Sequence, residues 1–406
     1  MNNLRKIYNC NLAMATDLYE LTMAQGYWKA GMTDREAIFH LFFRKNPFYG
    51  GFTIAAGITF ALEFLSDFKF KDEDLNYLKS LKGNDGNPLF DKNFLDYLRE
   101  LKIECDVDSV KEGTIVFPFE PILRVKGNII QSQIIEAALL NIINFHSLIA
   151  TKAARVCESA KNDPVIEFGM RRAHSFGGAI GASWAAYIGG CESTSNVIAG
   201  KLFNIPARGT HAHSWVQCFD SERDAFLTYA KVMPNNSIFV VDTYNSIQGV
   251  KNAVVAGKWL VKNGYKFFGI RIDSGNLNTI SRKAREILDE NGFYDTHIIA
   301  SGDLDEFIIS ELKKKNAPID IWGVGTKLAT GFGDPALGGV YKLSMITDKN
   351  GKWQHRMKLS EDLTKPSLTG IVQIRRFFDN NYYCGDILYD TFIGINDNTR
   401  ACCLEN

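Results

Sequence analysis

Five short apolar runs in the second half of the chain, each followed by a helical segment, constrain the fold most. The runs are rich in β-branched and aromatic residues and occupy residues 164–170, 237–246, 267–275, 296–306 and 319–326. They are apolar on both faces, as buried parallel strands are. From Asp242 onward, the ends of successive runs are 31, 30 and 23 residues apart, which is about the length of a strand–helix unit. The pattern therefore predicts an α/β fold with a parallel sheet.

Polar residues recur at the carboxyl end of these predicted strands. Asp242, Asp273 and Asp303 hold that position in three successive units. The active sites of β/α barrels are built at this end of the strands, whereas a doubly wound sheet usually carries one dominant Gly-rich turn early in the chain. We therefore predict a β/α barrel with an active site at its strand ends.

The length of the chain predicts two domains, because 406 residues exceed what one hydrophobic core usually holds. We assign residues 126–340 to the barrel and residues 1–125 to a smaller N-terminal α+β domain packed on it. Residues 341–406 contain an expected hairpin and could complete the N-terminal domain. A helix is expected from about Asp17 to Ala30, with Asp17 as its cap and a glycine at its end.

Composition and charge exclude several classes of protein. Hydrophobic residues make up 46% of the chain and charged residues 23%, which is typical of a folded globular protein. Basic and acidic residues each number 46, so the formal net charge is zero and neither a nucleic acid nor a membrane surface is an expected partner. The most apolar stretch, residues 129–154, contains Glu136 and His146, so we predict a buried helix rather than a membrane span.

The eight cysteines are scattered along the chain and form no CxxC pair. This spacing indicates neither a zinc site nor the disulfide framework of a secreted domain. We interpret the cysteines as buried free thiols in a reducing compartment. Because the first residues also lack an apolar signal core, the cytoplasm is the expected location.

The segment RGTHAHSW, residues 208–215, contains the first candidate site residues. His211 and His213 are two residues apart, so in an extended segment they would share a face. Two interpretations compete with a purely structural one: a metal pair as in barrel hydrolases, or one histidine acting as nucleophile or acid/base beside an incidental second. The metal interpretation needs more ligands from later strands, and those strand ends offer aspartates but no histidine.

Two further segments carry charged or phosphate-binding candidates. In IRIDSGN, residues 270–276, Arg271 and Asp273 alternate along a strand, and the carboxylate could bind a sugar hydroxyl, stabilise a cationic transition state or hold Mg²⁺.

The Gly-rich segment at residues 323–339 could close its backbone N–H groups on an oxyanion, with Thr326 adding a hydroxyl. Barrels often bind phosphate after their last strands, so we expect a phosphorylated sugar as ligand.

A fourth candidate lies in the segment at residues 167–183. Phe168 offers a stacking face and Arg171 a cation close to it in the sequence. Such a pair suits a flat aromatic acid, although a core phenylalanine beside a surface arginine would give the same pattern.

Taken together, these segments resemble the nicotinate phosphoribosyltransferases, a family of type II phosphoribosyltransferases. The matching segments occur in the family's order and extend over most of the chain. They are TDLYELTMAQGYW (16–28), FRKNPFYGGF (43–52), EFGMRRA (167–173), GGCESTSNVIAG (189–200), GTHAHSW (209–215), DTYNS (242–246), RIDSG (271–275), ASGDLDE (300–306), GVGTKLAT (323–330) and LGGVYKL (337–343). The resemblance implies an incomplete β/α barrel packed with a smaller α+β domain.

The resemblance also implies an activity and its partners. Members of the family join nicotinate to 5-phosphoribosyl-1-pyrophosphate, release pyrophosphate and nicotinate mononucleotide, and couple the reaction to ATP hydrolysis through a phosphohistidine. Mg²⁺ is expected to enter with the substrate, so no protein metal ligands are assigned. A cytoplasmic homodimer with shared active sites, acting in NAD biosynthesis by salvage, is implied as well.

The family's functional residues map onto particular positions of this chain. The family pattern GTxAH makes His213 the phosphorylated histidine and leaves His211 on the variable position. Asp273 matches the catalytic carboxylate on the ribose side. The implied nicotinate-binding residues are Tyr19 from a partner subunit, Phe168, Arg171, Thr210 and Arg271. The implied phosphoribosyl-pyrophosphate-binding residues are Gly302, Gly325 and Thr326.

One position departs from the family pattern. Most relatives have aspartate after IDSG, whereas this chain has Asn276, as the nicotinamide-using relatives do. Nicotinamide phosphoribosyltransferase is therefore the alternative function, although the TDLYELTMAQGYW and STSN segments lack the carboxylate that would read an amide. A metal-dependent barrel hydrolase using His211 and His213, and a catalytically inactive ligand sensor, are the alternatives from other classes.

Overall fold

The computed structural model describes residues 10–358, 368–396, 398 and 400. It divides into two compact units, Met1–Ser147 with Ala336–Asn406, and Leu148–Pro335. We call them unit 1 and unit 2; the helix α7 (Glu136–Ala160) runs through the boundary. The boundary expected after residue 125 falls inside strand β5 (Leu123–Asn128), which pairs with β1 (Glu36–Phe42), so the chain leaves unit 1 later than expected.

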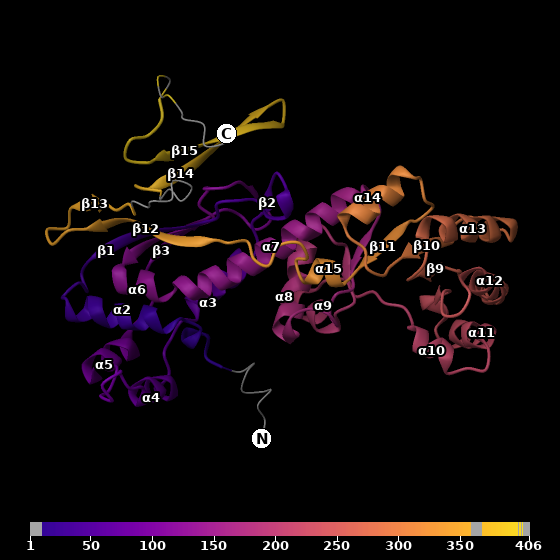
Figure 1. The fold of residues 1–406 in the computed structure, drawn as a ribbon, viewed down its shortest axis with the longest axis horizontal. Helices are drawn as coiled ribbons and strands as arrows, with labels where there is room; N and C mark the ends of the chain where they lie inside the picture. The colour runs from indigo at the N-terminus through magenta and orange to yellow at the C-terminus, as the bar shows by residue number, and fades with distance from the viewer. Residues whose placement is uncertain (1–9, 359–367, 397, 399, 401–406) are drawn as a thin grey trace. The chain divides into compact units, whose positions relative to one another are not determined.

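Unit 1 is built on an antiparallel sheet with the strand order β13-β12-β1-β5-β3 (Figure 1). Strands β12 (Val340–Thr347) and β13 (Trp353–His355) come from the end of the chain and complete a sheet begun near its start. Phe39 and Tyr341 stack with their ring centroids 4.7 Å apart across the β1–β12 pair. The other elements of unit 1 are η1 (Leu12–Met14), α2 (Leu18–Lys29), η2 (Pro47–Tyr49), β2 (Thr53–Ile54), α3 (Ile58–Ser66), α4 (Asp72–Ser80), α5 (Lys92–Glu100), β3 (Asp106–Ser109), β4 (Ile115–Val116), α6 (Ile129–Ile134), β14 (Val372–Asp379) and β15 (Tyr382–Asp390).

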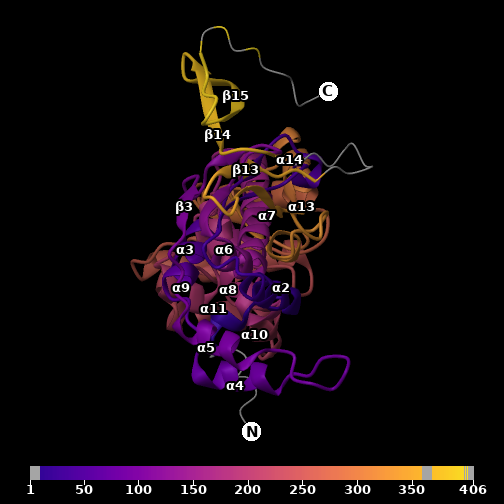
Figure 2. The same cartoon turned by 90° about the vertical axis from the view of Figure 1, so that its left-hand side faces the viewer.

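The expected hairpin is present as β14 and β15, and Figure 2 shows it on the opposite side of the sheet from α4 and α5. Arg376 attaches the hairpin to the preceding part of unit 1. Its Nη1 donates to the carbonyl oxygen of Ile115 at 2.8 Å, and its guanidinium lies over the ring of Phe117.

The first predicted helix is also present as α2, between Asp17 and the positive-φ Gly31. Asp17 is its N-cap residue but its side chain makes no capping hydrogen bond, contrary to expectation. The buried Glu20 instead accepts hydrogen bonds from the Thr16 hydroxyl and from the backbone N–H of Ala137 at 2.8 Å. Glu20 therefore fixes α2 to the start of α7.

Unit 2 confirms the predicted α/β architecture, with a six-stranded parallel sheet in the order β7-β6-β11-β10-β9-β8. Its outer strands, β7 and β8, are consecutive in the chain but do not pair with each other in the described residues. Thr194 of β7 instead forms an isolated parallel bridge with Ala207. Its elements are β6 (Val165–Glu167), α8 (Ser175–Ile188), β7 (Ser193–Thr194), α9 (Val197–Phe203), α10 (His213–Gln217), α11 (Glu222–Val232), η3 (Pro234–Asn236), β8 (Ile238–Val240), α12 (Ser246–Lys262), β9 (Gly269–Ile272), α13 (Leu277–Glu290), β10 (His297–Ala300), α14 (Glu306–Lys314), β11 (Ile321–Val324) and α15 (Thr326–Ala329).

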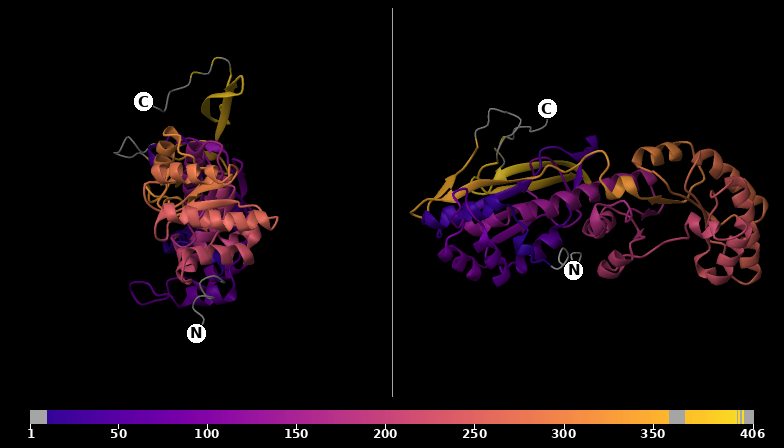
Figure 3. Two further views of the ribbon diagram at one scale, coloured as in Figure 1. Left: turned by 90° about the vertical axis from the view of Figure 1, so that its right-hand side faces the viewer. Right: turned by 60° about the horizontal axis from the view of Figure 1, so that its bottom comes forward.

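The strands of unit 2 are almost wholly buried, as their apolar sequences predict. In the right-hand view of Figure 3, the helices that follow these strands form an arc around their outer side. This is the layout of an open β/α barrel, in which each helix covers the strand before it. The five predicted strand runs correspond to β6, β8, β9, β10 and β11, whereas the two-residue β7 was not predicted.

Two expectations about exposure have different outcomes. Residues 129–154 fall in α6 and α7, and none of the helices in the described part of the chain has the length and apolarity that a membrane crossing needs. The expectation of buried thiols is wrong for most of the described cysteines, because Cys191 is buried whereas Cys10, Cys218 and Cys384 are exposed. Cys402 and Cys403 lie outside the described residues.

Candidate active site

The candidate site residues of unit 2 gather where its parallel strands end. β8, β9, β10 and β11 are consecutive neighbours in the sheet and run in the same direction. The residues that follow them therefore emerge at one edge of the sheet. This places Asp242, Asp273, Gly302 and Gly325 in adjacent turns at the carboxyl ends of their strands.

His213 lies beside the carboxylate of Asp273 at this edge. Its Nε2 is 3.9 Å from Asp273 Oδ2, and both side chains are 37% exposed, so both are open to a ligand. Its Nδ1 lies 3.0 Å from the hydroxyl oxygen of Thr243, which follows β8. In the tautomer in which Nδ1–H donates to Thr243, Nε2 carries the lone pair and faces Asp273.

The Asp273 carboxylate is positioned by groups from neighbouring strand ends. Its Oδ1 accepts a hydrogen bond from the hydroxyl of the buried Ser301, which follows β10. The backbone N–H of Asp273 donates to Asp242 Oδ2 at 3.0 Å, and the Ser274 hydroxyl donates to the same oxygen at 2.6 Å. Asp242 therefore holds the turn after β9, and Asp273 keeps one oxygen for a ligand.

Arg271 supplies a cation next to this carboxylate. Its Nη1 donates to the hydroxyl of Thr210, while its Nε is buried without a hydrogen-bond partner. Burial lowers the pKa of Arg271, and the carboxylates of Asp273 and Asp242 oppose that shift. The guanidinium of Arg171 is close enough to affect the same pKa. The site thus holds a half-buried arginine whose Nε has no hydrogen-bond partner, with a second arginine near it.

Phe168 forms an aromatic wall at the end of β6. A Cβ at Gly323 would lie 2.6 Å from the Phe168 ring, so only glycine lets the ring lie against β11. The turn after Phe168 is fixed by the buried Glu167, whose carboxylate accepts hydrogen bonds from the N–H of Gly169, from Ser183 at 2.8 Å and from Thr194 at 2.6 Å. This network ties the ends of β6 and β7 together under the aromatic ring.

The expected phosphate-binding turns follow β10 and β11, which are paired strands. Gly302 has a φ of +93°, and a Cβ there would lie 2.2 Å from the carbonyl oxygen of Asp273, so the position requires glycine. Gly325 precedes the short helix α15, and a Cβ there would approach the Phe168 carbonyl oxygen to 3.1 Å. Thr326 is half-buried next to it.

Tyr19 is the one predicted site residue that belongs to unit 1. It lies on α2 beside the buried Glu20 and is 46% exposed. Burial of part of the ring and the nearby carboxylates of Glu136, Glu20 and Asp17 raise the pKa of Tyr19 to about 12. Its hydroxyl is therefore neutral at physiological pH.

His211 does not share the environment of His213, which contradicts the idea of a metal pair. It is 7% exposed and packs against the rings of Phe226, Tyr229 and Phe239. Its Nε2 accepts the N–H of Val240 at 3.3 Å, and its Nδ1 lies 3.3 Å from a backbone carbonyl oxygen. Both ring nitrogens are thus used within the fold. In the described residues, no three His, Cys, Asp or Glu side chains are grouped to hold a metal ion.

The buried His211 makes the stability of unit 2 sensitive to acid. Burial lowers its pKa from 6.5 to about 4, so the unfolded chain binds a proton in that interval and the folded chain does not. Stability is therefore lost as the pH falls from 6.5 towards 4. We predict that acidification from about pH 7 to about pH 5 costs the wild type about 2 kcal/mol more than the His211→Phe variant. Urea unfolding at both pH values measures this difference, and equal losses in the two proteins would contradict it.

Comparison with known proteins identifies the family of this chain. The model of the nicotinate phosphoribosyltransferase N-terminal domain matches residues 14–144, and that of the nicotinate phosphoribosyltransferase family matches residues 164–371. The chain belongs to the nicotinate phosphoribosyltransferase family. The two matched regions end and begin on either side of the unit boundary at Ser147. The resemblance inferred from the sequence motifs is confirmed.

Individual relatives agree with this assignment. The nicotinate phosphoribosyltransferase of Bacillus subtilis is 45% identical over 395 residues, covering 96% of this chain and 78% of the relative. The human nicotinate phosphoribosyltransferase is 33% identical over 413 residues, covering 88% of this chain and 75% of the relative. A crystal structure of human nicotinic acid phosphoribosyltransferase has a TM-score of 0.79 at 29% identity, with 94% of this chain and 82% of that one covered. The nicotinate-nucleotide pyrophosphorylase of Pyrococcus furiosus, at 23% identity and a TM-score of 0.71, shares the fold.

Within this member of the family, Asn276 has a structural role. It is the N-cap residue of α13, and its side-chain oxygen accepts the N–H of Thr279 at 3.1 Å. Aspartate and asparagine serve equally well as N-caps. The departure from the family pattern is therefore compatible with an unchanged turn.

Sequence reasoning missed two residues that hold the catalytic candidates of this nicotinate phosphoribosyltransferase family member. Thr243 contacts His213, and Ser301 contacts Asp273. Both belong to motifs at strand ends, DTYNS and ASGD, and in each motif the aspartate is the residue that the sequence pattern indicates. Small hydroxyl residues next to a strand-end acid are the signal that could have found them.

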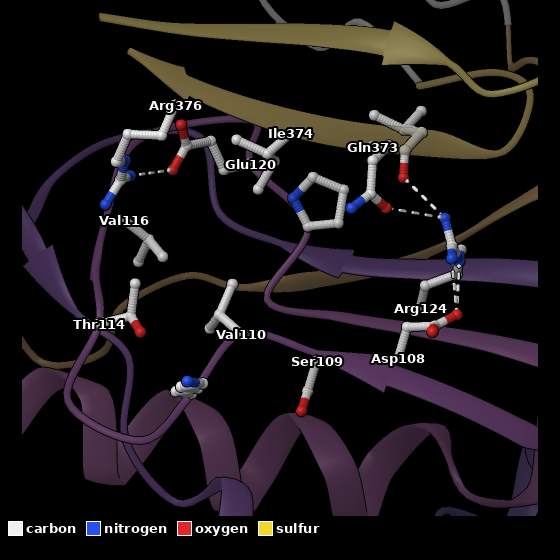
Figure 4. A pocket seen from close by; sticks show the side chains of 13 residues that line it. Asp108, Ser109, Val110, Thr114, Val116, Glu120, Arg124, Gln373, Ile374 and Arg376 are labelled. Carbon is white, nitrogen blue, oxygen red and sulfur yellow. Dashed lines mark hydrogen bonds and ion pairs between the residues drawn. The ribbon is translucent and has the colours of Figure 1, made fainter. Parts of the chain in front are cut away.

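A pocket of about 420 Å³ lies in unit 1, between β14 and residues 108–124 (Figure 4). Apolar side chains that include Val110, Val116 and Ile374 contribute to its lining. The ion pairs Arg124–Asp108 and Arg376–Glu120 lie at its two ends, so these charges are already paired. None of the predicted site residues lines it.

Proposed function

We propose that this chain is a nicotinate phosphoribosyltransferase of NAD biosynthesis. It joins the ring nitrogen of nicotinate to C1 of 5-phosphoribosyl-1-pyrophosphate, and the pyrophosphate leaves with the electron pair of its C1–O bond. The products are nicotinate mononucleotide and pyrophosphate. ATP hydrolysis is coupled to this reaction through phosphorylation of His213. The observation that carries the proposal is the placement of His213, Asp273 and Arg271 at one set of strand ends in a chain of this family.

Arg271 and Phe168 are suited to bind nicotinate. The carboxylate of nicotinate needs a cation, which Arg271 supplies with an unpaired buried Nε and with Nη1 oriented by Thr210. Arg171 adds a second positive charge, and the Phe168 ring offers a face for the pyridine. We propose that Tyr19 of a partner subunit covers the other face, in a cytoplasmic homodimer with shared active sites.

Asp273 and the glycine turns are suited to the phosphoribosyl group. Departure of pyrophosphate leaves positive charge on the ribose ring, and the exposed oxygen of Asp273 can stabilise it. Gly302, Gly325 and Thr326 present backbone N–H groups and a hydroxyl to the phosphates, so binding energy is used for positioning.

The carboxylate of Asp273 also fits Mg²⁺ that arrives on the substrate. Mg²⁺ is commonly held by one or two carboxylates together with substrate phosphates and waters. When bound, the ion neutralises charge on the departing pyrophosphate. Asp242 uses one oxygen for the turn after β9, and its other oxygen is buried without a partner, which suits a cation nearby.

His213 is suited to accept a phosphoryl group from ATP. Thr243 fixes its ring through Nδ1, so Nε2 is the nucleophile that attacks the γ-phosphorus while ADP leaves. Water then attacks the phosphohistidine and releases phosphate. Because Nε2 faces Asp273, the added negative charge arises beside the pyrophosphate site, where it can change the affinity for substrate and product.

Product analysis tests the proposal directly. The purified chain is incubated with 5-phosphoribosyl-1-pyrophosphate, Mg²⁺ and nicotinate, with and without ATP. We expect nicotinate mononucleotide and pyrophosphate in equal amounts, formed faster with ATP and with release of ADP. No product under either condition would refute the proposed function, and product without any ATP hydrolysis would refute the coupling through His213.

Arg271 should determine the affinity for nicotinate. Replacing it with methionine keeps the apolar stem and removes the cation that binds the carboxylate. We predict that KM for nicotinate rises on the order of 10²-fold while KM for 5-phosphoribosyl-1-pyrophosphate changes little. Steady-state kinetics with each substrate varied in turn measures the split. A parallel rise in both KM values would contradict a role specific to nicotinate.

A further inference from the structure

An ion pair links the two glycine turns that follow β10 and β11. Asp305 lies three residues beyond Gly302, and Lys327 follows Thr326 directly. Lys327 Nζ is 2.6 Å from Asp305 Oδ2, and the two side chains are 22% and 11% exposed. The pair therefore joins two segments that are separate in sequence and adjacent in the sheet.

Each member of the pair is also held on its other side. The second oxygen of Asp305 accepts the N–H groups of Phe307 and Ile308 at 3.1 and 2.8 Å, which caps α14. Lys327 Nζ lies 5.5 Å from the centroid of the Phe332 ring. Burial opposes the charge on Asp305, yet its pKa lies below its usual value because Lys327 and the N–H of Ile308 stabilise the carboxylate. The contact is thus a fixed, charged hydrogen bond.

Each turn has backbone hydrogen bonds of its own. The Gly302 carbonyl oxygen accepts the N–H of Leu304, and the Gly325 carbonyl oxygen accepts the N–H of Ala329 at 3.1 Å. These bonds lie within one turn and do not join it to the other. The backbone at Gly302 and Gly325 packs closely against the carbonyl oxygens of Asp273 and Phe168. Glycine has no side chain, so neither residue can contact the other turn through one. Phosphate binding by backbone N–H groups depends on their preset direction. A displacement of about 1 Å of such groups is enough to reduce reaction rates on the order of 10²-fold.

We propose that the Asp305–Lys327 ion pair is a positioning device that sets the spacing of the two phosphate-binding turns. This inference rests on the proposed function, because the turns are assigned to 5-phosphoribosyl-1-pyrophosphate there. Lys327 acts on the turn after β11 through Asp305 and does not contact the phosphate. Both residues are then positioning residues for the same substrate.

Kinetics of the Asp305→Asn and Lys327→Met variants test the proposal. Asparagine can still cap α14, and methionine retains the stem of the lysine. We expect each variant to raise KM for 5-phosphoribosyl-1-pyrophosphate on the order of tenfold, with KM for nicotinate unchanged. The double variant should be no worse than either single variant, because both remove one interaction.

The control is an ion pair of the same length at the other end of the strands. Lys313 Nζ is 2.6 Å from Asp163 Oδ2, and Asp163 precedes β6. Lys313→Met should leave both KM values unchanged.

Two other outcomes overturn the proposal. A rise in KM with Lys327→Met but not with Asp305→Asn would make Lys327 a direct phosphate ligand. An unchanged KM in both variants would remove the positioning role. Absence of product with the wild type would instead refute the proposed function, so the two failures are distinguishable.

Discussion

Replacing His213 with alanine removes ATP hydrolysis and leaves a slow, ATP-independent transfer to nicotinate. The substitution deletes the only nitrogen nucleophile that faces Asp273 in the described structure, so the phosphohistidine cannot form. We expect ATP hydrolysis to fall at least about 10³-fold, whereas substrate binding through Arg271 and the glycine turns persists. Release of ADP and formation of nicotinate mononucleotide, measured in the same reaction, separate the two effects.

The His211→Phe variant is the matched control for this prediction. His211 is only two residues away but is buried among aromatic rings, where phenylalanine has a similar shape. This variant should lose stability because the N–H of Val240 is left without its acceptor, yet it should keep ATP hydrolysis. ATP coupling that survives in His213→Ala and is lost in His211→Phe would reverse the assignment of the nucleophile.

Replacing Asp273 with asparagine should reduce kcat on the order of 10³-fold with little change in KM for nicotinate. Asparagine keeps the shape and can still accept the hydrogen bond from Ser301, so the turn after β9 should persist. What it removes is the negative charge opposite the developing positive charge of the ribose. Steady-state turnover with saturating nicotinate and 5-phosphoribosyl-1-pyrophosphate measures the loss.

A second histidine–aspartate pair at the opposite ends of the strands provides the control. His297 Nδ1 and Asp320 Oδ2 are 3.8 Å apart, almost the distance between His213 and Asp273. Asp320 accepts the N–H of Ile298 there, at the start of β10 and away from the candidate site. Asp320→Asn should keep kcat, and an equal loss in both variants would indicate a general effect on the sheet.

The fold, and the place of most candidate site residues at the strand ends, could be predicted because their signals are local. A buried parallel strand must be apolar on both faces, and functional groups of a barrel gather at its carboxyl end, so Asp242, Asp273 and Asp303 mark the strand ends in the sequence itself. The same regularity predicted the turns at Gly302 and Gly325. The family motifs added the roles of these positions.

What could not be predicted depends on contacts between distant segments. The side chain of Arg271 is oriented by Thr210, and that of His213 by Thr243, and in both cases the partner comes from another segment of the chain. The burial of His211 follows from the packing of α11 and β8 around it, whereas a two-residue spacing alone suggested a shared face.

The extent of unit 1 also depends on long-range pairing. Strand β12 pairs with β1 across almost the whole length of the chain, and β5 continues the same sheet. No change of composition in the sequence marks the pairing of β12 with β1 or that of β5 with β1. The boundary predicted after residue 125 is therefore too early. The strand β7 was missed because two residues cannot show a periodic pattern.

The ratio of kcat/KM for nicotinate to that for nicotinamide tests the central claim most directly. A site that binds a carboxylate with the half-buried Arg271 should reject the neutral amide, because the amide leaves the charge of Arg271 unpaired. With 5-phosphoribosyl-1-pyrophosphate, Mg²⁺ and ATP present, we predict a ratio of at least about 10³ in favour of nicotinate. A ratio near unity or in favour of nicotinamide would contradict a nicotinate-specific enzyme.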